Sequence, residues 1–202
     1  MKKVVAIIQA RMGSSRLPGK VMRTLRGEPM ILTCLKRLRA AKYVDQVVVA
    51  TTVLPEDDVL VDAVKKDNGI TIFRGDPENV LSRYYEAAAD ANADVIVRSY
   101  ADSPLVDPLI VDSAIIKFQQ CANVDYCSNK VKPTFPVGFD TEVFSMSGLE
   151  TIYNEETNQF DLEHVTTPFL RQKDRFKLEN LADVVDNSDL RVTVDYEEDF
   201  EV

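Results

Sequence analysis

The chain has 202 residues, of which 45% are hydrophobic, and this length and composition suit one sizeable α/β domain with a buried core. Its 33 acidic and 24 basic residues give a formal charge of −9, which disfavours broad electrostatic binding to nucleic acid or to an anionic membrane. No apolar run approaches the about 20 residues needed to span a bilayer, and the Lys2-Lys3 start lacks the apolar region of a signal peptide, so we expect a soluble, cytoplasmic protein.

The first predicted element is a strand over residues 4–8, which are all apolar, as in a strand buried on both faces of a parallel sheet. The loop that follows it, residues 9–20, carries Gly13, Gly19, Arg11, Arg16 and Lys20. Glycines allow backbone N–H groups to point together at an anion, and arginine and lysine bind phosphate oxygens. The loop therefore predicts a site for a nucleoside triphosphate.

This loop matches neither of the two common phosphate motifs. Five residues separate Gly13 from Gly19, one more than in a P-loop, and Val21 stands where a P-loop has its magnesium-binding hydroxyl. The G-x-G-x-x-G dinucleotide fingerprint is absent from the sequence. The alternative is a solvated basic loop, which is disfavoured because an apolar strand seldom leads into so many anion-binding groups by chance.

Strands and helices then alternate. Pro29 and apolar residues at helical spacing predict a helix over 29–41 that buries Cys34. The next expected elements are a buried strand over 46–52, a helix near 56–67, a strand over 70–73, a helix from Asp76-Pro77 to about Ala91, and a strand over 94–98. Asp107 before Pro108 is interpreted as a further helix cap.

From about Tyr126 the pattern is less regular. Residues 132–136 indicate a loop, and a short strand is expected over 141–145. The remaining expected elements are helices near 146–154 and 161–172, a strand over 190–195 and an acidic helical start after it.

Alternating short strands and helices predict right-handed βαβ crossovers, and hence a mainly parallel sheet with helices on both faces. Ligands of such sheets bind beyond the carboxyl ends of the strands. Three polar segments, 9–20, 74–84 and 98–107, follow predicted strands. We therefore expect these three segments to meet at one cleft.

Asp102 and Asp195 both follow strands at this expected edge. Mg²⁺ prefers oxygen ligands and often binds through one or two carboxylates plus substrate phosphates, so the two aspartates form a predicted magnesium site beside the phosphate loop. Each also has a structural alternative: Asp102 as a turn residue before Ser103-Pro104, and Asp195 as the cap of a helix that starts at Tyr196.

The three cysteines lack C-x-x-C spacing and His164 is the only histidine, so neither a zinc site nor a disulfide framework is expected. For His164 two roles stay open. It either caps or packs the helix of 161–172, or it binds the acceptor of a reaction.

The chain resembles the cytidylyltransferases that include CMP-Kdo and CMP-acylneuraminate synthetases, and especially the SpsF-like branch involved in spore coat polysaccharide. The matching segments are IIQARMGSSRLPGK at 7–20, VVVATT at 47–52, FRGDPENVLSRYYEAA at 73–88, VRSYADSPLVDP at 97–108, FDTEVFS at 139–145, EHVTTPFLR at 163–171 and LRVTVDYEEDFEV at 190–202. The resemblance implies a Rossmann-like nucleotidyltransferase fold of the nucleotide-diphospho-sugar transferase type. It also implies a single domain in which about 1–125 bind the nucleotide and about 126–202 supply the acceptor and metal side.

Individual roles are implied at the positions that match the family's motifs. The implied nucleotide-binding residues are Ala10, Arg11, Gly13, Ser14, Ser15, Arg16 and Lys20, with Gly75, Asn79 and Arg83 lining the pocket. On the acceptor side the resemblance implies Arg98, Asp140, Glu142, Glu163 and His164. Asp102 and Asp195 would hold Mg²⁺, and the catalytic set would be Arg11, Lys20, Asp102 and Asp195.

Some positions depart from the family's pattern. Ala101 precedes Asp102 where glycine is usual, Ser103 replaces a cysteine or glutamate, and Tyr196 replaces the threonine of the DTPED pattern. Val137 and Phe139 depart from its PxGLD pattern. These changes leave the metal-binding carboxylates in place and concern the acceptor pocket.

The implied reaction transfers CMP from CTP to an anionic sugar of the Kdo or sialic acid type, or to a related acceptor, and releases pyrophosphate for surface polysaccharide biosynthesis. Catalysis would depend on positioning and charge neutralisation, and any general base would be Asp102, Asp195 or a metal-bound water. Relatives of this kind are commonly homodimers. Two alternatives remain: a glycosyltransferase of the related fold, weakened because no D-x-D follows the strand of 94–98, and a non-catalytic nucleotide-binding module.

Overall fold

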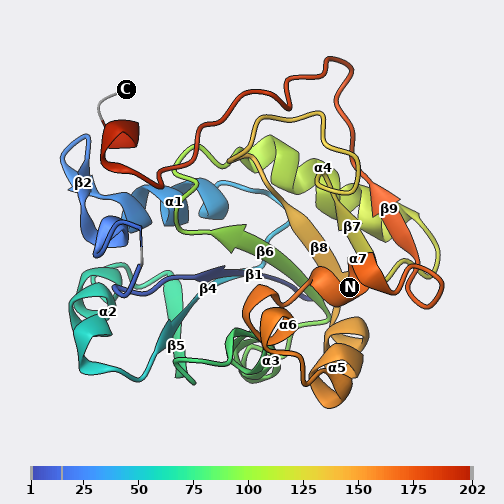
Figure 1. Cartoon of the computed structure of the whole chain (residues 1–202), viewed down its shortest axis with the longest axis horizontal. Helices are drawn as coiled ribbons and strands as arrows, with labels where there is room; N and C mark the ends of the chain where they lie inside the picture. The colour runs from blue at the N-terminus through green and yellow to red at the C-terminus, as the bar shows by residue number, and fades with distance from the viewer. Residues whose placement is uncertain (1, 15, 201–202) are drawn as a thin grey trace.

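Seven strands form one central sheet with helices packed on both of its faces (Figure 1). The structure is a computed structural model that describes residues 2–14 and 16–200. In chain order the strands of this sheet are β1 (Val4–Gln9), β4 (Gln46–Thr52), β5 (Ile70–Gly75), β6 (Val95–Tyr100), β7 (Tyr126–Ser128), β8 (Glu142–Ser145) and β9 (Leu178–Asn180). Across the sheet their order is β5-β4-β1-β6-β8-β7-β9.

Most neighbouring strands of this sheet run parallel. Four of the six strand pairs are parallel, whereas β8 is antiparallel to both β6 and β7. β1 lies between β4 and β6, with helices above and below it, which explains why its apolar run is unbroken. The predicted fold, a mainly parallel sheet with helices on both faces, is confirmed.

The helices bury two separate apolar cores. α1 (Met30–Arg39) and α4 (Pro108–Gln120) lie on one face of the sheet, and α3 (Val80–Asp90) and α5 (Met146–Glu155) on the other (Figure 1). Because successive strand residues point to opposite faces, Ile8 of β1 belongs to the core with α1, and Ile7 to the core with α3. Cys34 is fully buried in α1, as its helical spacing predicted.

Shorter elements complete the chain. They are the strands β2 (Thr24–Leu25) and β3 (Glu28–Pro29), the helices α2 (Asp58–Val64), α6 (Gln159–His164) and α7 (Thr167–Arg171), and the 3-10 turns Lys20–Met22, Pro55–Asp57 and Glu197–Phe200. Asp107 accepts a hydrogen bond from the Leu109 N–H at 2.7 Å and caps α4, as predicted. Over the described part of the chain, no helix has the length and apolar character that crossing a membrane requires.

The predicted start of α3 at Asp76-Pro77 was wrong. The helix begins at Val80, and the Asn79 side chain caps it by accepting the Ser82 N–H at 2.8 Å. Asp76 instead accepts the N–H groups of Glu78 and Asn79, at 2.8 and 3.1 Å. An Asp-Pro pair is favoured in such turns as well as at helix starts, so the local pattern alone could not separate the two.

The helix predicted over 161–172 is two short helices, α6 and α7. The chain turns at Val165, whose φ of 60° is unusual for a β-branched residue. The turn brings the His164 carbonyl and the Thr166 hydroxyl to the Arg98 guanidinium, each at 2.8 Å. This contact with a distant strand prevailed over local helix propensity.

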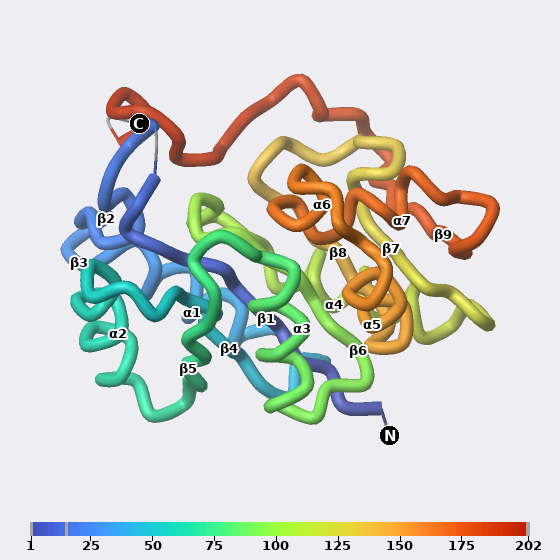
Figure 2. The backbone as a smooth tube through the Cα atoms, turned by 60° about the horizontal axis from the view of Figure 1, so that its bottom comes forward, coloured from blue at the N-terminus to red at the C-terminus, as the bar shows by residue number. Residues whose placement is uncertain are grey.

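The strand predicted over 190–195 is an extended segment outside the sheet. Its one bridge joins Arg191 to Val137, because the sheet edge beside β7 is already occupied by β9. Figure 2 shows this C-terminal segment leaving β9 and crossing to the hairpin of β2 and β3. It ends there through an ion pair between Arg23 and Glu197.

Candidate functional site

The loop after β1 is folded back on itself. The Met12 carbonyl accepts hydrogen bonds from the N–H groups of Ser14 and Gly19, both at 2.9 Å. Gly19 has a φ of 70°, a left-handed conformation that favours glycine, and it leads into the 3-10 turn of Lys20–Met22. The loop therefore presents Lys20 from a defined turn.

A buried carboxylate that the sequence analysis missed fastens this loop to the sheet. Asp57 is fully buried and accepts the Met12 N–H at 2.7 Å, together with the N–H and the hydroxyl of Thr52 at the end of β4. In sequence, Asp57 looks like an ordinary acidic residue in the first turn of a helix. No local signal distinguishes it from its exposed neighbour Asp58.

The two predicted metal ligands meet at Lys20. The Lys20 ammonium lies 3.0 Å from a carboxylate oxygen of Asp102, 3.1 Å from one of Asp195 and 3.0 Å from the Val194 carbonyl. Arg16 adds a second cation, 3.0 Å from the same oxygen of Asp195. Two carboxylates from distant parts of the chain thus share one position for a positive charge.

The C-terminal segment places Asp195 in this cluster. The Val194 N–H donates to the Asp102 carbonyl at 2.8 Å, which ties the segment to the end of β6. Asp199, not Asp195, accepts the backbone N–H groups of Asp195 and Tyr196, at 2.7 and 2.9 Å. Asp199 thus satisfies the N–H groups just before the 3-10 turn of Glu197–Phe200, and the Asp195 carboxylate faces Lys20 and Arg16.

This cluster fits a magnesium ion that is held together with phosphate. The ammonium of Lys20 shows that the carboxylates of Asp102 and Asp195 converge on one cation, and both offer the oxygen donors that Mg²⁺ prefers. Among residues 2–14 and 16–200, no three His, Cys, Asp or Glu side chains are grouped to hold a metal. Phosphate and water oxygens would therefore have to complete the coordination.

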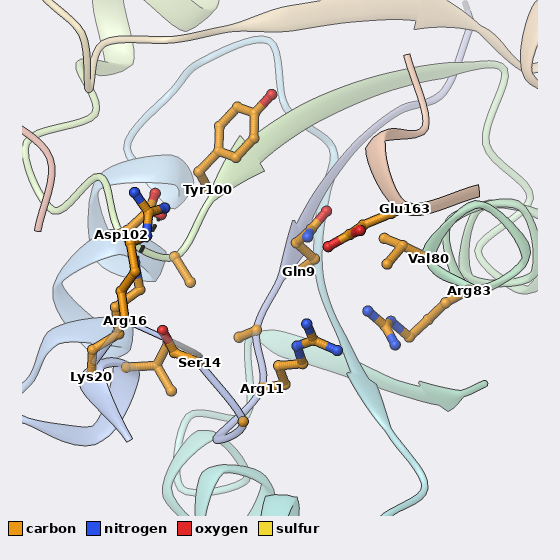
Figure 3. A pocket seen from close by; sticks show the side chains of 14 residues that line it. Gln9, Arg11, Ser14, Arg16, Lys20, Val80, Arg83, Tyr100, Asp102 and Glu163 are labelled. Atoms are coloured by element: carbon orange, nitrogen blue, oxygen red, sulfur yellow. Dashed lines mark hydrogen bonds and ion pairs between the residues drawn. The ribbon is translucent and has the colours of Figure 1, made fainter. Parts of the chain in front are cut away.

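The cleft has a second positive end. Figure 3 shows the guanidinium groups of Arg11 and Arg83 directed toward one another, away from the group of Arg16, Lys20 and Asp102. Within the described residues, neither Arg11 nor Arg83 has a carboxylate within the 4.0 Å of an ion pair. Burial lowers the pKa of Arg83, and the nearby Arg11 lowers it further. An anionic ligand would supply the missing negative charge.

Residues from all three predicted polar segments line this cleft. The predicted site residues among them are Ala10, Arg11, Gly13, Ser14, Arg16, Lys20, Arg83, Asp102 and Glu163, whereas Gln9, Val21, Val80, Tyr100 and Ala101 line it without having been predicted. Gln9 and Tyr100 end their strands at the ligand edge, a position that could have identified them.

Two predicted nucleotide-binding residues, Gly75 and Asn79, are absent from the described lining of the cleft. Gly75 ends β5, where an added Cβ would lie 2.9 Å from the Phe73 ring. Asn79 uses its side chain to cap α3. Ser15 lies outside the described residues.

Most of the predicted acceptor residues lie around a second, smaller pocket. Its lining includes Arg98, Glu142 and His164, together with Tyr100, Tyr126 and Lys130, which were not predicted. Asp140 borders it, 3.5 Å from the Lys130 ammonium, and Glu163 faces the larger cleft instead. The His164 ring also packs on Phe160 with ring centroids 4.2 Å apart. Both roles considered for His164 are compatible with this position.

Arg98 and Glu142 form the buried base of the smaller pocket. Arg98 donates to His164, Thr166 and Gln9 and lies 3.6 Å from Glu142. Burial alone would raise the pKa of Glu142, but Arg98 and Lys130 lower it to about 2. Glu142 therefore stays ionised beside Arg98, whose two terminal nitrogens are hydrogen-bonded and whose buried Nε has no partner among the described residues.

Comparison with known proteins identifies relatives of this chain. A family model described as cytidylyltransferase matches residues 5–200. The spore coat polysaccharide biosynthesis protein SpsF of Bacillus subtilis is 31% identical over 218 aligned positions, which cover 100% of this chain and 85% of SpsF. A 3-deoxy-manno-octulosonate cytidylyltransferase of Geobacter sulfurreducens is 36% identical over 113 positions, or 55% of this chain and 44% of its own.

A solved structure has nearly the same fold. The cytidylyltransferase of Leptospira borgpetersenii superposes with a TM-score of 0.95 at 35% identity, over 100% of this chain and 84% of its own.

Proposed function

The chain belongs to the cytidylyltransferase family, and on this premise we propose that it transfers CMP from CTP to an anionic sugar or a related acceptor, releasing pyrophosphate. The observation that carries the proposal is the convergence of Lys20, Asp102 and Asp195 beside the basic loop after β1. Such a cluster can receive a triphosphate and the metal ion that accompanies it.

In the proposed reaction an oxygen of the acceptor attacks the α-phosphorus of CTP. The new bond joins that oxygen to phosphorus as the bond to the pyrophosphate oxygen breaks, so the electron pair and charge pass to pyrophosphate. The hydroxyl proton of the acceptor would pass to Asp102, Asp195 or water. Arg11 and Arg83 at one end of the cleft, and Arg16 and Lys20 at the other, would neutralise this charge. No covalent enzyme intermediate is needed.

Asp102 and Asp195 would hold the magnesium ion. When bound, Mg²⁺ neutralises phosphate charge and orients the reacting phosphate. In the structure the two carboxylates form ion pairs with Lys20 and Arg16. When Mg²⁺ replaces these cations between the carboxylates, Lys20 and Arg16 would be free to contact phosphate oxygens of the nucleotide.

The acceptor is proposed to be a sugar of a surface polysaccharide. SpsF is named for spore coat polysaccharide biosynthesis, and the Geobacter relative for 3-deoxy-manno-octulosonate, a sugar acid. The smaller pocket shares Tyr100 with the cleft that Asp102 lines, which supports its assignment to the acceptor.

Pyrophosphate release tests this proposal. The protein with Mg²⁺ is given CTP, UTP, ATP or GTP, together with 3-deoxy-manno-octulosonate, N-acetylneuraminate or a neutral amino sugar. CTP with a sugar acid should release pyrophosphate, and Lys20→Ala and Asp102→Ala should abolish it. Turnover of nucleotide-sugars alone would indicate a glycosyltransferase, and CTP binding with no pyrophosphate release would indicate a non-catalytic module.

A further inference from the structure

Tyr100 is the boundary between the two pockets. It is the last residue of β6, and it lines the nucleotide cleft on one side and the smaller pocket on the other. No other residue among 2–14 and 16–200 lines both. Asp102 follows Tyr100 by two positions, so the short backbone segment after β6 keeps the Tyr100 ring close to the cluster of Lys20, Asp102 and Asp195.

The Tyr100 side chain is held at both its hydroxyl and its ring. The hydroxyl donates to the Glu142 carboxylate and accepts from the Lys130 ammonium at 3.2 Å. The Arg98 guanidinium lies 4.8 Å from the ring centroid and the Lys130 ammonium 4.9 Å from it. Burial, with Glu142 adding to it, raises the pKa of Tyr100 well above its usual value, so the hydroxyl stays a donor.

The charged side chains of the smaller pocket differ in their exposure to solvent. Arg98 and Glu142 are 5% and 1% exposed, and they form an ion pair inside the protein. The Lys130 side chain is 36% exposed, and its ammonium lies 3.5 Å from Asp140 and 3.6 Å from Glu142. Lys130 is thus the cation of the described pocket lining that a solute can reach.

We propose, on the basis of the proposed CMP transfer, that Tyr100 and Lys130 determine which acceptor is used. Tyr100 lies where the acceptor pocket meets the nucleotide cleft and helps to position the acceptor, and Lys130 binds the single acidic group of a monoanionic sugar acid. Such an acid would displace Asp140 from the ammonium, while the buried Glu142 stays paired with Arg98. Burial raises the pKa of Asp140, so Asp140 gives up its charge more readily than a solvated aspartate and the exchange is eased. A dianionic sugar phosphate would exceed what one ammonium can balance.

Steady-state pyrophosphate release tests this inference. Lys130→Met should raise the KM for the sugar acid roughly tenfold or more, as expected for the loss of a hydrogen bond to a charged group. The KM for CTP should change by less than about twofold, since Lys130 does not line the nucleotide cleft. Lys130→Arg should restore part of the acceptor affinity. Lys132→Met, an exposed lysine on the same loop, is the matched control and should behave like the unmodified protein.

Tyr100→Phe is the second variant. It keeps the ring and removes the hydroxyl that holds Lys130, so it should raise the KM for the acceptor several-fold with little change in the KM for CTP. If both variants leave the acceptor KM unchanged, or raise both KM values equally, the inference is wrong while the proposed function stands. If the unmodified protein releases no pyrophosphate with any acceptor, the proposed function fails, and the inference falls with it.

Discussion

The ammonium of Lys20 lies 3.0 Å from a carboxylate oxygen of Asp102, although 82 positions separate the two residues in the chain. Asp195 reaches the same ammonium at 3.1 Å. A positive charge therefore already occupies the position between the two carboxylates. A metal ion that binds there must compete with Lys20 unless phosphate draws the ammonium away.

Removing the Lys20 charge should strengthen metal binding in the absence of nucleotide. Lys20→Met should raise the affinity for Mn²⁺, used as a probe for Mg²⁺, by about tenfold or more, because the ammonium no longer occupies the position between the two carboxylates. Electron paramagnetic resonance of free Mn²⁺ measures this directly. Lys36→Met, which removes an exposed lysine paired with Glu28, is the control and should bind Mn²⁺ as the unmodified protein does. Unchanged or weaker Mn²⁺ binding by Lys20→Met would show that Lys20 does not occupy the metal position.

Asp57 should be important for stability although it lies outside the cleft. Asp57→Ala would leave the buried N–H groups of Met12 and Thr52 without their acceptor, and should lower the free energy of unfolding by about 2–4 kcal/mol. Urea denaturation measures this change. The neighbouring Asp58→Ala removes an exposed pair with Arg74 and should change stability by less than about 1 kcal/mol. Equal effects of the two substitutions would contradict the assigned role.

Glu142 should make stability depend on pH. Its pKa in the folded protein is about 2, below its ordinary value of 4.5, so it contributes stability that is fully present above about pH 4.5 and is lost as the pH falls toward 2. The shift corresponds to at most about 3 kcal/mol. The difference in unfolding free energy between the unmodified protein and Glu142→Gln should therefore be largest near neutral pH and shrink in acid. A difference that stays constant from pH 7 to 3 would rule out this linkage.

Local sequence patterns predicted what depends on local chemistry. Three features could be predicted because each depends on residues close together in sequence. They are the apolar run of β1, the glycines and cations of the following loop, and the Asp107 cap. The wrong predictions concern segments whose conformation depends on contacts with residues distant in sequence. The break at Val165 follows from Arg98, and the extended segment of 190–195 follows from a sheet edge already occupied by β9.

For the candidate site, the sequence predicted which loops meet but not how their side chains pair. The rule that ligands bind at the carboxyl ends of parallel strands brought the loops after β1 and β6 together correctly. It could not show that Lys20 bridges Asp102 and Asp195, since side-chain pairing across the cleft is not encoded in spacing. The same rule points to Tyr100 as the end of β6, but it could not show the contacts of Tyr100 with Glu142 and Lys130 on later segments.

The two buried arginines should respond in opposite ways to substitution. Arg83 is 1% exposed, has no carboxylate within ion-pair distance among the described residues, and donates one hydrogen bond to the Asp76 carbonyl at 2.6 Å. Arg83→Met should therefore leave the free energy of unfolding within about 1 kcal/mol of its starting value, or raise it, because an unpaired buried charge is removed. Arg98→Met removes the partner of buried Glu142 and should lower it by about 3 kcal/mol or more.

Ligand binding distinguishes the two arginines a second time. Because Arg83 faces Arg11 in the cleft, Arg83→Met should weaken CTP binding by about tenfold, as measured by calorimetry with Mg²⁺ present. Unchanged stability together with weaker CTP binding would mean that Arg83 binds the ligand and does not stabilise the fold. Large destabilisation with unchanged CTP affinity would instead make it a structural residue, and the anionic ligand between Arg11 and Arg83 would have to be abandoned.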